Sequence, residues 1–246
     1  MEEKLLLDIA LPDHKEVREA FDSVMVKLYA QYQKNKEEEK RNVQQGTEIE
    51  VQKGFVFLVC GTDPFVGTST TVLYLAAGLA KSGKHVLLVD ADLRKDRMEK
   101  QIGRECANTL AEYLLGICTL ENIIYPTILE DLDVVPGGKI VDPVPFLCSR
   151  RMHNLFKMLK KEYDIILVDV PAMGSTSDAI AVLRETNQII LVAAPYKSYK
   201  KQIIECVEIF QKYGGNLLGI VVNQVDHYGY TQYKRSAKQK RKNKIG

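Results

Sequence analysis

The sequence predicts an α/β fold in which a doubly wound, mostly parallel sheet follows an N-terminal helical arm. Six short apolar runs are rich in Val, Ile and Leu without polar alternation, which is typical of strands buried on both faces of a sheet. These runs span residues 55–59, 85–89, 132–135, 165–168, 189–192 and 217–222. Patterns of helical spacing lie between several of them, at residues 69–82, 150–161 and 199–213. Such alternation of strands and helices favours a parallel sheet covered by helices on both sides.

The chain of 246 residues divides into three predicted parts. Residues 1–50 form an amphipathic helix and a linker, residues 51–226 form the sheet domain, and residues 227–246 form a basic tail that contains tyrosines. The hydrophobic content of 46% is enough for one large core. The five cysteines are scattered, odd in number and without a CxxC pair, which favours reduced thiols over a disulfide framework or a zinc site.

The start of the chain lacks the charge pattern of a signal peptide, and no apolar run approaches the ~18 residues of a membrane span. We therefore expect a cytoplasmic protein whose membrane contact, if any, is peripheral and at the inner face. From residue 234 to the end there are seven Lys or Arg and no acidic residue. This tail is interpreted as solvated or as attracted to an anionic membrane surface; nucleic acid is the less favoured partner.

The helical arm is predicted from residue 13 to about residue 40. Apolar residues recur at three- and four-residue steps, and Asp13 is the candidate N-cap. The apolar positions are Val17, Phe21, Val24, Leu28 and Tyr32. We interpret the charged stretch that ends at Gly46 as a solvated helix end and linker. The apolar face is expected to dock on the domain or on another subunit.

The loop after the first strand reads VCGTDPFVGTSTT, residues 59–71. Gly61 and Gly67 have the spacing of the phosphate-binding P-loop, G-x-x-x-x-G-K-[ST], and Ser69 is in place. In such a loop, backbone N–H groups and a helix N-terminus point at an anion. Thr70 follows in the expected helix start, but Thr68 stands where the pattern has lysine. The predicted phosphate site is therefore built without its usual cation.

Three carboxylates follow predicted strands, namely Asp90, Asp92 and Asp169. Because the carboxyl ends of parallel strands share one edge of the sheet, we expect these side chains to lie near the loop. A Ser or Thr hydroxyl together with strand-end Asp residues is the Mg²⁺ site of P-loop NTPases. The competing interpretation, in which each Asp only caps the next helix, fits one such residue better than three.

Residues 54–223 resemble the cytoplasmic tyrosine autokinases of bacterial capsule and exopolysaccharide synthesis, the BY-kinases. The most specific piece is KSGKHVLLVDADLRKDRM, with its D-A-D-L-R core. Further matches are LEDLDVVPGGK, SRRMHNLFKMLKKEYDIILVDVPAMGSTSDA and LLGIVVNQ. The family's D-T-P-P segment here reads D-V-P-A, residues 169–172. The partition ATPases of the ParA/MinD type are more distant relatives with the same P-loop NTPase fold.

The resemblance implies that the cofactors are ATP and Mg²⁺. Ser69 and Asp90 would hold the metal, and Asp169 would act through water. Asp92 would lie near the phosphates as a possible base, and Asn223 would contact the adenine. The family also ends in tyrosines that accept phosphate; here the matching residues are Tyr228, Tyr230 and Tyr233. Read without the resemblance, these three tyrosines are loop or packing residues.

The chain departs from the family at its loop, where P-G-E-G-K-S-T is replaced by P-F-V-G-T-S-T, residues 64–70. Thr68 removes the point charge on the phosphates. Phe65 removes the backbone freedom of a glycine, and Val66 removes an acidic residue. A loop cation from elsewhere, Lys139 or Arg94 with its neighbour Lys95, is the candidate substitute.

A second departure concerns the family's E-x-x-R-x-x-R segment for ring-like self-assembly. Glu19 is present, but Asp22 and Met25 replace the two arginines, which would oppose the same ring. We therefore expect a degenerate BY-kinase that regulates polysaccharide export together with a membrane-embedded Wzz-like adaptor. The alternatives are an active tyrosine autokinase with a non-standard P-loop, and a ParA/MinD-like partition ATPase. Self-association in another form stays open.

Overall fold

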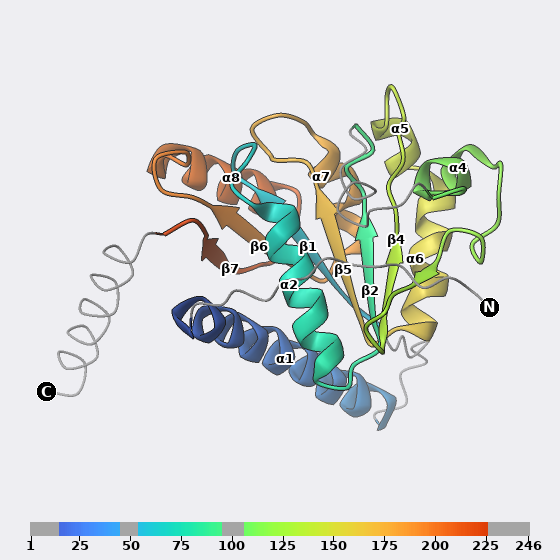
Figure 1. Cartoon of the computed structure of the whole chain (residues 1–246), viewed down its shortest axis with the longest axis horizontal. Helices are drawn as coiled ribbons and strands as arrows, with labels where there is room; N and C mark the ends of the chain where they lie inside the picture. Colours follow the sequence, from blue (N-terminus) through green and yellow to red (C-terminus); the bar gives the residue numbers. More distant parts are fainter. Residues whose placement is uncertain (1–14, 45–53, 95–105, 226–246) are drawn as a thin grey trace, which may run out of the picture.

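The computed structural model describes residues 15–44, 54–94 and 106–225 and contains one seven-stranded sheet (Figure 1). Its strand order is β3-β4-β2-β5-β1-β6-β7. Neighbouring strands are parallel except for β3, which pairs antiparallel with β4. The strands are β1 (Phe55–Gly61), β2 (Val86–Asp90), β3 (Tyr125–Pro126), β4 (Leu132–Val135), β5 (Ile165–Val170), β6 (Gln188–Ala193) and β7 (Leu217–Val222). The predicted fold class is thus confirmed.

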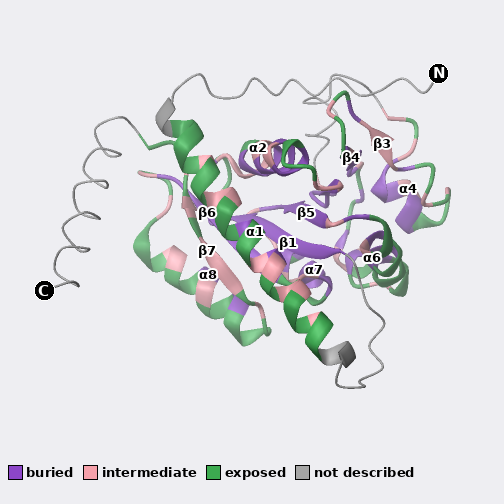
Figure 2. Ribbon diagram, turned by 90° about the horizontal axis from the view of Figure 1, so that it is seen from below, coloured by how far each residue is buried: buried purple, intermediate pink, exposed green. Residues whose placement is uncertain are grey.

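Helices cover both faces of this sheet (Figures 1 and 2). The helices are α1 (Lys15–Gln44), α2 (Thr68–Lys81), α4 (Leu110–Leu115), α5 (Val144–Leu147), α6 (Arg150–Glu162), α7 (Asp178–Val182), the 3-10 turn η1 (Leu183–Glu185) and α8 (Lys200–Lys212). Alternate residues of β1 point to two separate cores. Phe57 and Val59 join the core under α1 and α2, whereas Val56 and Leu58 join the core under α6, α7 and α8.

Two sequence expectations about strands need correction. Every residue of β1, β2, β5 and β6 is buried, as predicted, but β7 is not buried on both faces. Among the described strands it is bonded only to β6, and Ile220 and Val222 are 43% and 56% exposed. A short apolar run does not distinguish a central strand from an edge strand. The antiparallel β3 was not predicted because two residues carry no periodic pattern.

The arm docks on the domain. Leu28 is fully buried and Tyr32 nearly so, both in the core under α2. The Phe21 and Tyr74 rings lie 5.1 Å apart between centroids, and a side-chain carbon on Gly78 would meet the sulfur of Met25 at 2.1 Å. Glycine therefore permits α1 to approach α2 closely.

The helix α1 ends at Gln44, later than predicted, and Asp13 lies outside the described residues. The charged segment stays helical because its opposite charges are three or four residues apart. The pairs are Lys34–Glu38, Lys36–Glu39 and Glu37–Arg41, with nitrogen–oxygen distances of 3.8, 2.8 and 4.0 Å. The stretch from residue 34 to Gln44 is thus a helix end, as interpreted, and the expected linker up to Gly46 lies outside the described residues.

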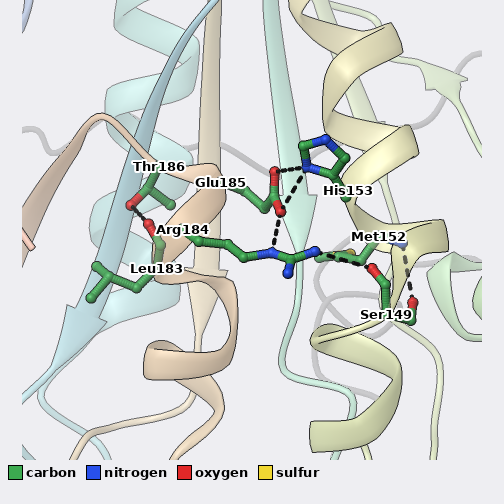
Figure 3. A network of polar contacts seen from close by, with 7 residues as sticks. All are labelled: Ser149, Met152, His153, Leu183, Arg184, Glu185 and Thr186. Atoms are coloured by element: carbon green, nitrogen blue, oxygen red, sulfur yellow. Dashed lines mark hydrogen bonds and ion pairs between the residues drawn. The ribbon is translucent and has the colours of Figure 1, made fainter. Parts of the chain in front are cut away.

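A buried carboxylate joins α6 to η1 (Figure 3). Glu185 is 3% exposed, and its oxygens lie 2.7 Å from Arg184 Nε and 3.1 Å from His153 Nδ1. Arg184 also donates to the backbone oxygen of Ser149, the N-cap of α6. Because a buried charge is costly unless it is paired, this network fixes η1 on α6. It thereby positions α7, which immediately precedes η1 and begins at the candidate site.

Candidate functional site

The loop between β1 and α2 folds back on itself. Gly67 is the N-cap of α2 with a φ of 86°, a left-handed conformation that glycine adopts without strain. A side-chain carbon on Gly61 would lie 2.6 Å from Thr68 Oγ1, so the Thr68 side chain crosses the inside of the loop. Both glycines of the predicted P-loop pattern are therefore required by the observed geometry. Gly67, Thr68, Ser69 and Thr70 all line one cavity of about 270 Å³.

Side chains from distant parts of the chain hold this loop by its carbonyl groups. Lys197 Nζ and Gln224 Nε2 donate to the Phe65 oxygen at 2.8 and 2.9 Å. Asn223 Nδ2 donates to the Val66 oxygen at 3.0 Å. The predicted adenine contact of Asn223 is not tested by this arrangement, which shows its amide nitrogen bound to the loop backbone. Lys197 and Gln224 were not foreseen, because partners more than 100 residues away leave no local pattern.

The two substituted apolar residues of the loop behave differently. Val66 is fully buried in the core under α2, so its side chain anchors the loop to that core. Phe65 is 71% exposed and has a φ of 65°, in the left-handed region that costs a non-glycine residue about 1–2 kcal/mol. The loop thus keeps the shape that a glycine would favour, although a phenylalanine occupies the position.

Phe65→Gly is expected to raise the free energy of unfolding by up to ~1 kcal/mol. Relief of the left-handed strain outweighs the ~0.4–1 kcal/mol by which glycine stabilises the unfolded chain. Urea denaturation measures the change. Phe65→Ala is the matched control, since it removes the exposed ring but keeps the strain. If both variants were stabilised equally, the exposed ring of Phe65 would be the source of the instability. That result would contradict the explanation by left-handed backbone strain.

The three predicted carboxylates meet at the edge of the sheet. Asp90 on β2 is directly paired in register with Asp169 on β5, and both residues are 3% exposed. Asp92 is 9% exposed, and its backbone N–H donates to Asp90 Oδ1 at 2.9 Å. A side-chain carbon on Gly137 would lie 3.0 Å from Asp90 Cγ, so glycine leaves room for that carboxylate. Of the three, Asp92 lines the cavity.

The charge inside the cavity is unusual for a phosphate site. Among the described residues that line it, Arg94 is the only cation, whereas Asp63 and Asp92 are acidic. Asp63 Oδ1 accepts a hydrogen bond from Gln202, but its buried Oδ2 has no partner among the described residues. Lys139 is exposed and does not line the cavity. Lys95 lies outside the described residues.

The donor set fits a magnesium nucleotide in part. Ser69 at the start of α2 and the neighbouring carboxylates of Asp90 and Asp169 are hard oxygen ligands of the kind that Mg²⁺ takes together with phosphate oxygens. No group of three or more His, Cys, Asp or Glu in the described part of the chain is arranged as a metal site by itself. A metal here would therefore need the hydroxyl and the phosphates as further ligands.

Several predicted functional residues lie outside the cavity or outside the residues that the structure describes. Glu19 and Asp22 are exposed on α1, and Met25 packs against α2. The predicted phosphoacceptors and the basic tail, including Tyr228, Tyr230 and Tyr233, fall outside the described residues. In the described ranges, no helix combines the length and apolar character that a membrane crossing requires.

Comparison with known proteins places this geometry in a family. The AAA domain family model matches residues 64–220. The chain is 30% identical over 173 residues to the tyrosine-protein kinase CpsD of Streptococcus pneumoniae, covering 70% of this chain and 76% of CpsD. It is 26% identical over 186 residues to the tyrosine-protein kinase Wzc of Salmonella typhimurium, covering 72% of this chain. The match spans only 26% of the length of Wzc.

Solved structures agree with these relatives. The kinase domain of the Escherichia coli tyrosine kinase ETK has a TM-score of 0.67 and 28% identity, covering 75% of this chain and 72% of that domain. The septum site-determining protein MinD of Pyrococcus horikoshii, solved with Mg-ADP, has a TM-score of 0.60 and 28% identity, covering 69% and 70%. The chain therefore belongs to the bacterial tyrosine-kinase (BY-kinase) family, on the AAA-type P-loop ATPase fold.

Proposed function

We propose that this chain is a BY-kinase-like regulator of capsule or exopolysaccharide synthesis and export, with impaired or lost ATP-dependent tyrosine phosphorylation. One observation carries the proposal: Thr68 occupies the lysine position of the loop, in a cavity that is also lined by the acidic residue Asp63. A charge-assisted hydrogen bond contributes about 1.5–3 kcal/mol, so losing the lysine weakens phosphate binding about 10- to 100-fold. The Asp63 carboxylate would repel a triphosphate as well.

The remaining residues still support ATP and Mg²⁺ as cofactors. Ser69 and Asp90 would hold Mg²⁺ directly, and Asp169 would do so through water. The metal would supply the positive charge that neutralises the phosphates. Asp92 would lie at the phosphates, and Asn223 would contact the base from the end of β7. The Mg-ADP bound to the MinD relative supports this choice of cofactors.

The partners are part of the same proposal. A membrane-embedded Wzz-like adaptor would recruit the chain to the cytoplasmic face of the membrane, and the basic tail would add attraction to anionic lipid. Tyr228, Tyr230 and Tyr233 would be the phosphoacceptors for any remaining activity of this chain or of a complete kinase. A family-like ring is not favoured, because Asp22 and Met25 replace arginines. The Met25 side chain also packs against α2 of its own domain.

The test is incubation of the purified chain with labelled ATP and Mg²⁺, followed by a phosphotyrosine blot. The ETK kinase domain, run in parallel, is the positive control. We expect labelling at least about 10²-fold below that control, because a cation on the transferring phosphate contributes about 10³–10⁵ in rate. Strong labelling that disappears in Asp90→Ala would overturn the proposal and favour the active autokinase. ATP-dependent dimerisation stimulated by lipid or DNA would favour the partition ATPase.

A further inference from the structure

Arg94 is placed to act as the cation of the cavity. Its backbone N–H donates to Asp92 Oδ1 at 3.3 Å, which fixes the turn after β2. Its side chain is 34% exposed and lines the same cavity as Thr68 and Ser69. Among the described cations, Arg94 can therefore donate hydrogen bonds to a phosphate that lies in this cavity beside the α2 N-terminus.

Asp178, the first residue of α7, orients this guanidinium. Arg94 Nε and Nη2 donate to Asp178 Oδ2 and Oδ1, both at 2.8 Å, and Asp178 is fully buried. This two-pronged contact uses two of the five N–H groups of the guanidinium, so three remain for another acceptor. The neighbouring carboxylate also raises the pKa of Arg94, which keeps it charged. An oriented donor loses little freedom when an anion binds.

The sheet order indicates which part of a nucleotide Arg94 would meet. The loop follows β1, while Asn223 follows β7, two strands away on one side. Arg94 follows β2, two strands away on the other side. A nucleotide whose base lies toward Asn223 and whose phosphates meet the α2 N-terminus therefore directs its last phosphate toward Arg94.

We propose that Arg94, oriented by Asp178, binds the terminal phosphate of ATP, so that the site distinguishes ATP from ADP. This inference rests on the nucleotide binding in the proposed function. It does not require phosphoryl transfer. A contact with the terminal phosphate supports binding, although it supplies no charge inside the loop at Thr68. The chain would then respond to ATP as a ligand even where its chemistry is weak.

The experiment is calorimetric titration of the full chain with ATP and with ADP, each with Mg²⁺. Arg94→Gln is expected to weaken ATP binding about tenfold and to leave ADP binding within about twofold. Arg94→Lys keeps the charge but not the two-pronged contact. Its ATP affinity should therefore lie between that of the wild type and that of Arg94→Gln. Lys139→Gln removes an exposed cation of a neighbouring loop and should change neither affinity.

The outcomes separate this inference from the proposed function. Equal losses of ATP and ADP affinity in Arg94→Gln, or no loss of either, would overturn the role of Arg94. A wild-type chain that binds neither nucleotide would also overturn it, while the regulator without kinase activity would stand. Strong phosphotyrosine labelling together with an ATP-selective loss in Arg94→Gln would sink the proposed function and support the inference. Thermal melting checks that each variant is folded.

Discussion

Thr68→Lys is expected to raise the affinity of the chain for ATP about 10- to 100-fold, since it restores a charge-assisted contact worth about 1.5–3 kcal/mol. The Thr68 side chain already crosses the loop toward Gly61, so a lysine in its place starts from inside the loop. Mg²⁺-dependent phosphotyrosine labelling should also rise. The rise should stay below the about 10³–10⁵ of a complete transition-state cation, because Phe65 and Asp63 remain.

Calorimetry and the phosphotyrosine blot measure the two effects of this substitution. Thr68→Met is the matched control, because it adds a long side chain without charge and should leave the ATP affinity at or below that of the wild type. If Thr68→Lys and Thr68→Met behave alike, the missing charge is not what limits the site. The shape of the loop, with its phenylalanine in a left-handed conformation, would then be the limiting feature.

Leu28→Ala is expected to lower the free energy of unfolding by about 2–5 kcal/mol, as for other fully buried leucines. Leu28 lies in the core beneath α2, so the substitution leaves a cavity between the arm and the domain. For a chain of this size, each kcal/mol corresponds to about 2–4 °C in melting temperature. Thermal and urea denaturation both report the loss.

Val26→Ala is the control for that experiment, because Val26 lies two residues away on the same helix and is 68% exposed. It should change the stability by less than about 0.5 kcal/mol. A Leu28→Ala variant as stable as this control would mean that α1 does not pack on the domain in solution. The arm would then be available to another subunit, the alternative that the sequence left open.

The sheet could be predicted because a strand buried on both faces must be apolar along its whole length. The same reasoning placed Asp90 and Asp169 together, since parallel strands end at one edge. It failed for β7, whose sequence is as apolar as that of a central strand although nothing in the described chain pairs with its outer edge. An apolar sequence shows that a strand can be buried, whereas the order of the strands determines whether its faces and edges are covered.

The site was harder to predict than the sheet. The loop glycines follow a spacing rule, but the partners of the loop do not. Lys197 and Gln224 reach Phe65 across 132 and 159 residues, and Asp178 reaches Arg94 across 84. Such contacts depend on the fold being formed first. The sequence suggested Arg94 and Lys139 equally as substitute cations, and the buried carboxylate of Asp178 distinguishes them.

The attachment of the loop to β7 also affects how the domain opens locally. An edge strand has one unpaired side and half-exposed side chains, so it belongs to the part of a sheet that unfolds at the lowest free energy. Asn223 and Gln224 follow this strand and hold the Val66 and Phe65 carbonyls. When β7 detaches, the loop loses two of its supports at once. The loop between β1 and α2 and the edge strand therefore form one cooperative unit, although a central strand precedes the loop.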